Sequence, residues 1–382
     1  MIILMNSTVR STDDIRVQDV IEKAISFDVK GEATMKEGGH TDIVQVFLID
    51  DDNKPVAGIP DHPFRQMNGV REVVRVSTPE ISLKNNGHSE PRHIKIGSDF
   101  IGRRLPCVPV FGHCAADQHI DKTAKILAGL GIKHLRGGGY KPRSNAFGFR
   151  GHGEKGWEWL VDAAHGNGME SVWTEVIESK DIETVLRIRD SSKFQGDIVL
   201  WVGARNTGNQ HLLEALGTRS DIIAMVKHSP EMKSIDQFIE RASFVVNGPM
   251  FWKKDGSLDE EASKATGNDN LMLCVRGLTN PTEHSTRRFY GNVGWIKALH
   301  EEVWAPVVYD PSHIAGNNLL VPETLREGMV YHPEAVLIET HCAPSLGLCD
   351  DSYQSVNVNQ IPELLEIIQS HNEKLPKNTE TA

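Results

Sequence analysis

The strongest constraint on the fold is a regular alternation of short apolar runs and amphipathic segments from Cys107 onward. Apolar runs of strand length predict strands at 107–112, 132–136, 170–175, 198–203, 222–227, 271–276, 306–309 and 335–339. Helical periodicity predicts helices at 119–130, 154–167, 181–189, 208–216, 233–246, 286–300, 321–329 and 360–371. Eight βα units over about 265 residues match the size of a TIM (β/α)8 barrel. An open doubly wound sheet is the alternative, but no Gly-x-Gly-x-x-Gly fingerprint follows the early strands.

Residues 1–76 are predicted to form a separate, small α+β domain with a ferredoxin-like or ACT-like fold. Strands are expected at Ile2–Leu4, Ile43–Ile49 and Val70–Val76. The polar run Thr12–Asp14 is typical of a helix N-cap before an amphipathic segment. We expect such a domain to serve stability or oligomerisation, with regulation by a bound ligand as the alternative.

The other domain limits follow from composition. Residues 77–105 are polar, so we expect a linker with room for a short hairpin. The barrel is expected over residues 106–375, followed by a C-terminal tail at 376–382. The segment 248–270 makes the connection before the sixth barrel strand unusually long.

The bulk composition excludes several classes of protein. The 382 residues include 39% hydrophobic and 24% charged side chains and carry a formal net charge of −11. This is ordinary for a globular protein, and the acidic balance argues against nucleic acid as the main partner. No run reaches the roughly 18 apolar residues of a membrane span, and the N-terminus lacks the basic flank of a signal peptide. We therefore expect a cytoplasmic protein that binds no membrane, with its five cysteines reduced.

Charged or metal-binding side chains follow nearly every predicted barrel strand. Active sites of (β/α)8 barrels lie at the C-terminal ends of the strands, so these residues are expected at one mouth. Charges needed only for solubility would be spread over both ends. The set comprises Cys114, Arg136, Lys141, Arg143, Glu175, Arg205, Asn206, Lys227, His228, Arg276, Asp310, His313, Glu339 and His341.

Six of these residues are cations, and three of the six lie in the stretch Arg136–Ser144, which also contains three consecutive glycines. Glycine lets the backbone approach a ligand closely, and guanidinium groups suit phosphate and carboxylate oxygens. Cations at one mouth repel each other unless anions bind, which predicts two anionic ligands or one ligand with two phosphates. A solvated turn is the alternative for the glycine-rich stretch alone. The six cations are Arg136, Lys141, Arg143, Arg205, Lys227 and Arg276.

A second group has the composition of a metal site: Cys114, His313, Glu339 and either Asp350 or Asp351. The first three follow strands 1, 7 and 8, which barrel closure makes neighbours. A thiolate, an imidazole and carboxylates suit Mn, Fe, Co or Zn better than Mg or Ca. One such divalent ion would act as a Lewis acid on a carbonyl group. A lone Cys or His is usually only packed, so the combination carries the prediction.

Seven motifs occur along the chain in this order: Phe111-Gly-His-Cys-Ala115, Leu135-Arg-Gly-Gly-Gly-Tyr-Lys-Pro-Arg-Ser144, Gly203-Ala-Arg-Asn206, Cys274-Val-Arg-Gly277, Thr286-Arg287, Asp310-Pro-Ser-His313 and Glu339-Thr-His341. Together they resemble class I 3-deoxy-D-arabino-heptulosonate 7-phosphate (DAHP) synthases, most closely the β-type with a ferredoxin-like N-terminal domain. The resemblance covers the barrel throughout and the first 75 residues more weakly. The sibling 3-deoxy-D-manno-octulosonate 8-phosphate (KDO8P) synthases have Lys-Ala-Asn-Arg-Ser where this chain has Lys-Pro-Arg-Ser, which favours the DAHP branch.

The resemblance implies the condensation of phosphoenolpyruvate with erythrose 4-phosphate, the first step of the shikimate pathway to aromatic amino acids. It assigns phosphoenolpyruvate to Arg136, Lys141, Arg205, Lys227 and Arg276, and the aldehyde's phosphate to Arg143 and Ser144. The catalytic residues would be Lys141, His313 and Asp310, the last lying beside the metal. Metal ligands would be Cys114, His313, Glu339 and an Asp, with Asp351 slightly preferred and Asp350 as the alternative. The family also suggests a homo-oligomer, either a tetramer or a dimer.

Some positions depart from the family pattern. Gly-Pro-Cys-Ser is replaced by Gly112-His113-Cys114-Ala115, and Lys-Arg-Gly by Lys227-His228-Ser229. Thr-Ser-Pro after Lys-Pro-Arg is replaced by Ser144-Asn145-Ala146. These changes keep two alternatives open: a paralogue that uses a different aldehyde sugar, and a non-catalytic barrel that senses phosphorylated metabolites. The retained Cys114, His313 and Glu339 argue against the sensor, because a binding protein needs no Lewis acid.

Overall fold

The computed structural model describes residues 1–36, 43–49, 59–74, 83–85, 90–143, 146–254, 256, 259, 262–263, 267–281, 286–347 and 351–375, without the side chains of Asp351 and Ser352. The chain divides into two compact units. One comprises Met1–Ile81 and Met250–Ala265, and the other comprises Ser82–Pro249 and Thr266–Ala382. Each unit has its own hydrophobic core.

The N-terminal unit has the βαββαβ order and the antiparallel sheet order β2-β3-β1-β4 of a ferredoxin-like fold. Its elements are β1 (Ile2–Met5), α1 (Ile15–Ile25), β2 (Lys30–Lys36), β3 (Ile43–Ile49), α2 (His62–Arg65) and β4 (Val70–Val74). Helix α1 begins where expected, because the Asp14 carboxylate accepts the Arg16 N–H as an N-cap. Val17, Val20 and Ala24 form its buried face against the sheet.

Strand β2 was not expected from its sequence, Lys-Gly-Glu-Ala-Thr-Met-Lys. It lies at the edge of the sheet, where none of its residues is buried, so it needs no apolar alternation. Its position depends on the backbone ladder with β3 from Lys30 to Lys36.

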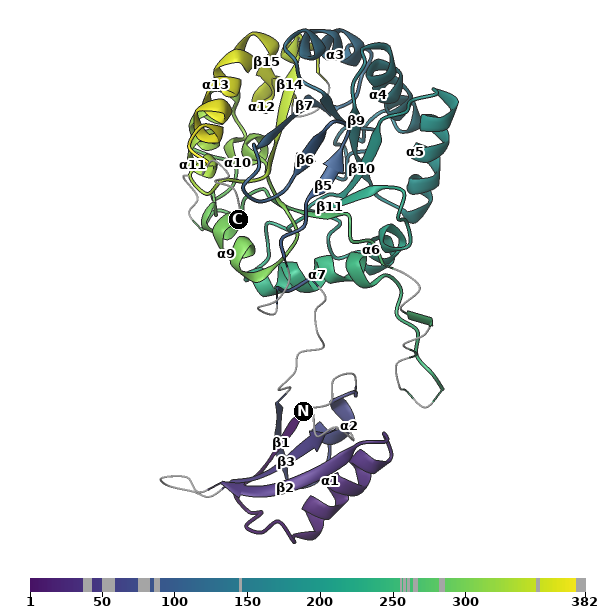
Figure 1. The fold of residues 1–382 in the computed structure, drawn as a ribbon, viewed down its shortest axis with the longest axis vertical. Helices are drawn as coiled ribbons and strands as arrows, with labels where there is room; N and C mark the ends of the chain where they lie inside the picture. Colours follow the sequence, from purple (N-terminus) through teal and green to yellow (C-terminus); the bar gives the residue numbers. More distant parts are fainter. Residues whose placement is uncertain are drawn as a thin grey trace, which may run out of the picture. The chain divides into compact units, whose positions relative to one another are not determined.

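The larger unit is a closed (β/α)8 barrel, as the alternation predicts (Figure 1). Its parallel strands follow the order β13-β12-β11-β10-β9-β8-β7-β14, and pairing of β13 with β14 closes the ring. The strands are β7 (Val108–Ala115), β8 (His134–Gly138), β9 (Ser171–Val176), β10 (Asp197–Val202), β11 (Ile223–Lys227), β12 (Leu271–Val275), β13 (Val307–Tyr309) and β14 (Ala335–His341). The main surrounding helices are α3 (Ile120–Gly129), α4 (Glu154–Gly166), α5 (Ser179–Ser191), α6 (Gln210–Gly217), α7 (Ile235–Asn247), α9 (Gly294–Glu302), α11 (Val321–Met329) and α13 (Ile361–Asn372).

The barrel interior is filled by alternate residues of the strands, among them Val110, Val199, Met225 and Leu337. A hairpin of β5 (Ile94–Ile96) and β6 (Asp99–Ile101) contributes three isoleucines, Ile94, Ile96 and Ile101, to the same core. This part of the expected linker therefore belongs to the barrel core.

The expected helix at 286–300 starts later than predicted, at Gly294. The backbone N–H groups of Arg288 and Phe289 instead donate to the carbonyls of Ala315 and Ile314, which ties this segment to the loop after β13. That loop contains a five-residue helix that was not predicted, α10 (Pro311–Ala315). The other elements within the described residues are α12 (Asp351–Gln354), the two-residue strand β15 (Val356–Asn357) and short 3-10 helices at Asn318–Leu320, Pro344–Leu346 and Val358–Gln360.

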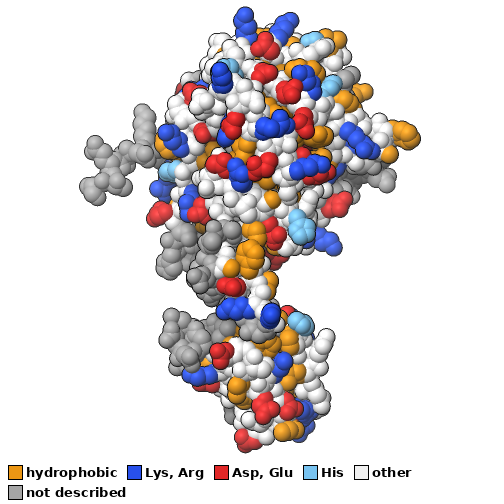
Figure 2. All heavy atoms as spheres, turned by 90° about the vertical axis from the view of Figure 1, so that its right-hand side faces the viewer, with side chains coloured by type: hydrophobic (Ala, Val, Ile, Leu, Met, Phe, Trp, Pro, Cys, Tyr) orange, Lys and Arg blue, Asp and Glu red, His pale blue; other side chains and the backbone are white. Residues whose placement is uncertain are grey.

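Acidic and basic side chains are interspersed over the face shown in Figure 2. Such mixing does not create a single-sign field on that face. Among the residues described, no helix has the length and apolar character needed to cross a bilayer.

Candidate active site

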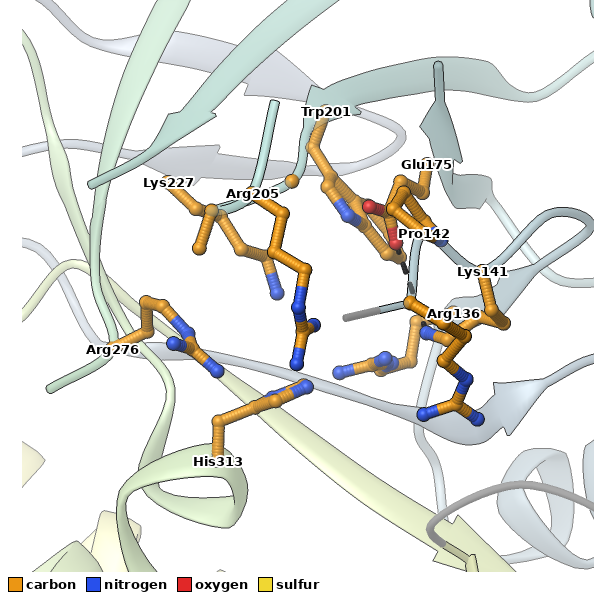
Figure 3. Close-up of a pocket in the computed structure, with 12 residues that line it drawn as sticks. Arg136, Lys141, Pro142, Glu175, Trp201, Arg205, Lys227, Arg276 and His313 are labelled. Carbon is orange, nitrogen blue, oxygen red and sulfur yellow. Dashed lines mark ion pairs between the residues drawn. The ribbon is translucent and has the colours of Figure 1, made fainter. Parts of the chain in front are cut away.

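A strongly cationic pocket lies at the C-terminal ends of the barrel strands (Figure 3). Most of its lining side chains belong to the last residues of β8 to β12 or to the loops that follow them. The pocket brings together all six predicted cations and His313. Its lining consists of Arg136, Lys141, Pro142, Arg143, Glu175, Trp201, Gly203, Ala204, Arg205, Lys227, Arg276 and His313.

Backbone geometry at Gly112 brings β7 close to β8 beside this pocket. Gly112 has φ +150°, and a Cβ there would lie 2.0 Å from the Arg136 carbonyl oxygen. Any other residue would clash with the backbone, so glycine is required before His113-Cys114. The β7–β8 register also shifts between Gly112 and Ala115.

Three of the cations have buried carboxylate partners. Arg136 Nη2 lies 2.9 Å from Glu339 Oε1, and Lys227 Nζ lies 2.8 Å from Asp310 Oδ2. Lys141 Nζ lies 3.7 Å from Glu175 and donates to the Cys114 carbonyl oxygen at 3.0 Å. These pairs are at most 9% exposed, so their charges are little screened by solvent.

Charged neighbours set the charge states of two of these carboxylates, Glu339 and Asp310. Burial acts to raise the pKa of Glu339, but His313, Arg136 and Lys141 outweigh it and lower that pKa to about 2. Burial likewise opposes ionisation of Asp310, yet His313, Lys227 and Arg136 hold its pKa well below the usual range. Both groups are therefore anions at neutral pH.

Asp310 also fixes the histidine next to it. Its carboxylate caps α10 by accepting the His313 backbone N–H at 3.1 Å. The same oxygen lies 3.0 Å from His313 Nδ1. Burial lowers the pKa of His313 to about 4, so the ring is neutral at pH 7 with its Nδ1–H donated to Asp310. The lone pair of Nε2 therefore faces Glu339, whose Oε1 is 3.6 Å away.

A second buried histidine supports Arg276. The backbone N–H of Arg276 donates to His228 Nε2 at 3.0 Å, and His228 Nδ1 lies 3.0 Å from the Ser229 carbonyl. The His228 ring packs against Trp295 and Phe238, and burial lowers its pKa to about 3. Burial lowers the pKa of Arg276 to about 10, so its guanidinium remains charged at neutral pH.

The predicted metal ligands fit a metal in part. His313 and Glu339 present two donor atoms at a spacing suited to one ion, and the Nδ1–H bond to Asp310 is the usual support for a ligating imidazole. Cys114 is fully buried at the end of β7. In the described part of the chain, however, Cys114, His313 and Glu339 do not form a group with all ligand atoms within 4.8 Å of one another. Gln354 also donates to the second Glu339 oxygen.

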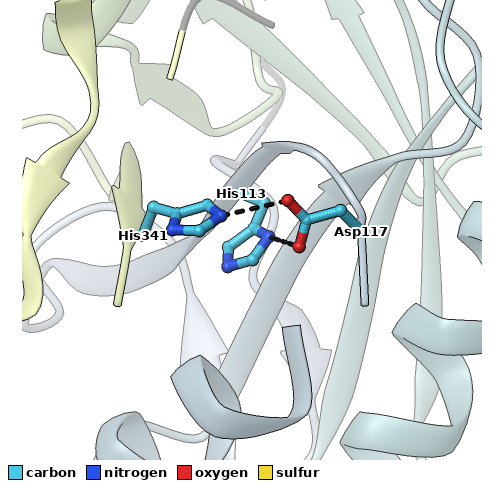
Figure 4. A group of neighbouring side chains, drawn as sticks. All are labelled: His113, Asp117 and His341. Atoms are coloured by element: carbon cyan, nitrogen blue, oxygen red, sulfur yellow. Dashed lines mark hydrogen bonds and ion pairs between the residues drawn. The ribbon is translucent and has the colours of Figure 1, made fainter. Parts of the chain in front are cut away.

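A different group meets that distance: His113, Asp117 and His341 (Figure 4). His341 Nε2 lies 3.1 Å from one Asp117 oxygen and His113 Nδ1 lies 3.3 Å from the other, while the two rings stack at 4.0 Å. His341 Nδ1 accepts the backbone N–H of Ala343 at 2.9 Å, which places the ring proton on Nε2. The group could hold a metal only if His341 Nε2 lost this proton. With the proton in place, His113, Asp117 and His341 form a hydrogen-bonded group next to Cys114.

Arg143 connects the cationic pocket to a second one. The second pocket is lined by Tyr140, Lys141, Pro142, Arg143, Ala146, Arg150, Gly151 and Ile177. Arg143 Nε donates to the Phe149 carbonyl at 2.9 Å, which anchors the side chain between the two pockets. Ser144 and Asp350 lie outside the described residues, and Asp351 is described only as the first residue of α12.

Sequence reasoning assigned no role to Trp201, Glu175 or the pair Asp117–His341. Glu175 was noted only as a strand-end charge, but it lies beside Lys141. Trp201 could have been found from its position, because it occupies the last inward place on β10, two residues after Val199. The contact between Asp117 and His341 joins residues 224 positions apart and leaves no local signal.

Comparison with known proteins identifies the family. Residues 81–377 match the model of the DAHP synthetase I family. The chain belongs to this family. It is 28% identical over 356 residues to a phospho-2-dehydro-3-deoxyheptonate aldolase from Thermotoga maritima, covering 93% of each chain.

Solved structures give the same result. The crystal structure of a DAHP synthase from Thermotoga maritima matches 98% of this chain and 97% of its own, with a TM-score of 0.78 and 26% identity. A truncated form of the enzyme from that organism matches 77% of this chain and 97% of its own, with a TM-score of 0.62 and 26% identity. The predicted resemblance to DAHP synthases is therefore confirmed. Members of the family are metal-dependent enzymes.

Proposed function

We propose that this member of the DAHP synthetase I family condenses phosphoenolpyruvate with erythrose 4-phosphate, giving DAHP and inorganic phosphate. Carbon 3 of phosphoenolpyruvate bonds to the aldehyde carbon, and the aldehyde oxygen takes up a proton. Water adds at carbon 2, and phosphate leaves by cleavage of its C–O bond. This reaction is the entry to the shikimate pathway.

The observation that carries the proposal is the convergence of six cations on one pocket with a neutral histidine at its edge. Phosphoenolpyruvate carries a phosphate and a carboxylate, which are the groups that guanidinium and ammonium donors bind best. We assign its binding to Arg136, Lys141, Arg205, Lys227 and Arg276.

The carboxylates of the site orient these donors and the histidine. Each carboxylate holds one cation in a fixed position before the substrate arrives: Glu339 holds Arg136, Asp310 holds Lys227, and Glu175 holds Lys141. Such preorganisation removes the cost of ordering long side chains during binding. We assign Lys141, His313 and Asp310 as the catalytic residues, with Asp310 keeping His313 in the tautomer that leaves Nε2 free of a proton.

A divalent metal held by Cys114, His313, Glu339 and Asp351 would polarise the aldehyde carbonyl. The mixed thiolate, imidazole and carboxylate donors favour Mn, Fe, Co or Zn. Asp350 is the alternative fourth ligand. We assign the aldehyde's phosphate to Arg143 and Ser144, because Arg143 lies between the cationic pocket and the second pocket. A homo-oligomer and a cytoplasmic location stay predictions.

The test is a phosphate-release assay with the full-length protein, Mn²⁺, phosphoenolpyruvate and a panel of aldehydes. We expect turnover to depend on both substrates and to be fastest with erythrose 4-phosphate. Turnover with another aldehyde sugar, but none with erythrose 4-phosphate, would favour the paralogue instead. Binding of phosphoenolpyruvate without turnover on any aldehyde would favour the sensor.

A further inference from the structure

Trp201 lies at the boundary between the barrel core and the cationic pocket. It is 1% exposed, belongs to the apolar core cluster and also lines the pocket (Figure 3). In the parallel ladder it pairs with Glu175 on β9 and with Met225 on β11. One residue thus contacts both the apolar layer below and the charged layer above.

Two of the pocket's cations lie over the indole of Trp201. The Arg136 guanidinium carbon is 5.2 Å from the ring centroid, and Lys227 Nζ is 4.8 Å from it. Arg136 comes from β8 and Lys227 from β11, so the ring lies beneath cations from strands on both sides of β10. Both cations are almost completely buried, and cation–π attraction is strongest when the cation is desolvated.

An aromatic face stabilises a cation in a way that suits a substrate site. A further carboxylate at this position would occupy N–H donors that the substrate needs, and it would repel the anionic ligand. The indole attracts the positive charge through its quadrupole and takes up no hydrogen-bond donor. It can therefore hold two like charges near each other while their donors stay directed at the pocket.

We propose that Trp201 is a positioning residue that holds Arg136 and Lys227 in place for the phosphate and carboxylate of phosphoenolpyruvate. The inference rests on the proposed function and adds to it a residue for which neither the motifs nor the family match gives a role. It concerns binding of phosphoenolpyruvate and not the aldehyde, because both cations over the ring are assigned to phosphoenolpyruvate.

The test compares Trp201→Phe and Trp201→Leu in the full-length enzyme. Phosphoenolpyruvate affinity is measured by calorimetry without aldehyde, and KM for each substrate and kcat are measured with Mn²⁺. We expect Trp201→Leu to weaken phosphoenolpyruvate binding about 10- to 30-fold, and Trp201→Phe to weaken it less because it keeps an aromatic face. The KM for the aldehyde and kcat should change less than about threefold.

Trp173 provides the matched control. It is fully buried in the same core cluster, its indole N–H donates to Ser171, and none of the cation–π contacts in the described part of the chain involves it. Trp173→Leu should lower thermal stability as Trp201→Leu does but leave phosphoenolpyruvate affinity unchanged.

Three outcomes would overturn the inference. Parental phosphoenolpyruvate affinity in a folded Trp201→Leu variant would show that the ring does not position the cations. Equal weakening in Trp173→Leu would show a general packing effect. A parent enzyme that neither binds nor consumes phosphoenolpyruvate would remove the proposed function and, with it, this role for Trp201.

Discussion

Lowering the pH from 7 to 5 should destabilise the barrel, and His228 should account for a definable share of the loss. Its pKa is lowered by burial from 6.5 to about 3 in the folded state. As the pH falls, the unfolded chain therefore binds a proton at this position before the folded chain does. The His228 contribution to stability is complete above pH 6.5 and is lost progressively toward pH 3. Linkage gives a loss of about 2 kcal/mol between pH 7 and pH 5 from this side chain alone.

The assay is urea unfolding of the parent and of His228→Gln at several pH values, followed by tryptophan fluorescence. Glutamine is neutral at every pH used and can accept the Arg276 N–H as His228 does. All other titrating groups are common to both proteins, so the difference between their pH slopes isolates His228. We expect the variant to lose about 2 kcal/mol less than the parent over this range. Equal slopes would refute the reasoning, because His228 would then have a similar pKa in the folded and unfolded chains.

Three further predictions concern the candidate site. Cys114→Ala should abolish turnover while largely sparing phosphoenolpyruvate binding by calorimetry, and full activity would show that Cys114 is not a metal ligand. Arg143→Lys should raise the aldehyde KM about tenfold by removing bidentate contacts and leave the KM for phosphoenolpyruvate unchanged, whereas an effect only on the latter would reverse the assignment. Asp310→Asn should lower the free energy of unfolding by about 3 kcal/mol, because Lys227 loses its buried carboxylate; a loss no larger than that of exposed Asp190→Asn, measured by the same urea titration, would contradict this.

The barrel was largely predictable because its signal is local and repeated. Several barrel strands are buried on both faces and contain a continuous apolar run, as in Val199–Val202. The covering helices keep an apolar face, as α5 does with Ile182, Val185 and Leu186. Elements that lack this signal were missed or misplaced. Strand β2 is exposed at a sheet edge, and the segment before Gly294 takes its backbone partners from Ile314 and Ala315.

The cations of the candidate site were predictable because the C-terminal ends of barrel strands converge on one mouth. That rule brought together the cations of the pocket without knowledge of any distance. It could not say how each charge is compensated, since Arg136 and Glu339 are 203 residues apart. The rule also could not separate the predicted metal ligand Cys114 from the group formed by His113, Asp117 and His341. His113 and Cys114 are adjacent in sequence, but consecutive residues of a strand point to opposite faces of the sheet.

Charge compensation in the pocket uses two kinds of partner, and they have different consequences for substrate binding. Glu339 and Asp310 neutralise Arg136 and Lys227 but occupy donors, so an arriving anion competes with them for the same N–H groups. The Trp201 ring stabilises the same two cations without such competition. If carboxylates alone neutralised the cations, the pocket would be stable but would bind an anionic substrate weakly. Without any carboxylates, the buried cations would be unpaired at a cost of several kcal/mol. Sharing the compensation between carboxylates and an aromatic face allows the cations to be held in place and still bind an anion, in a chain whose net charge is −11.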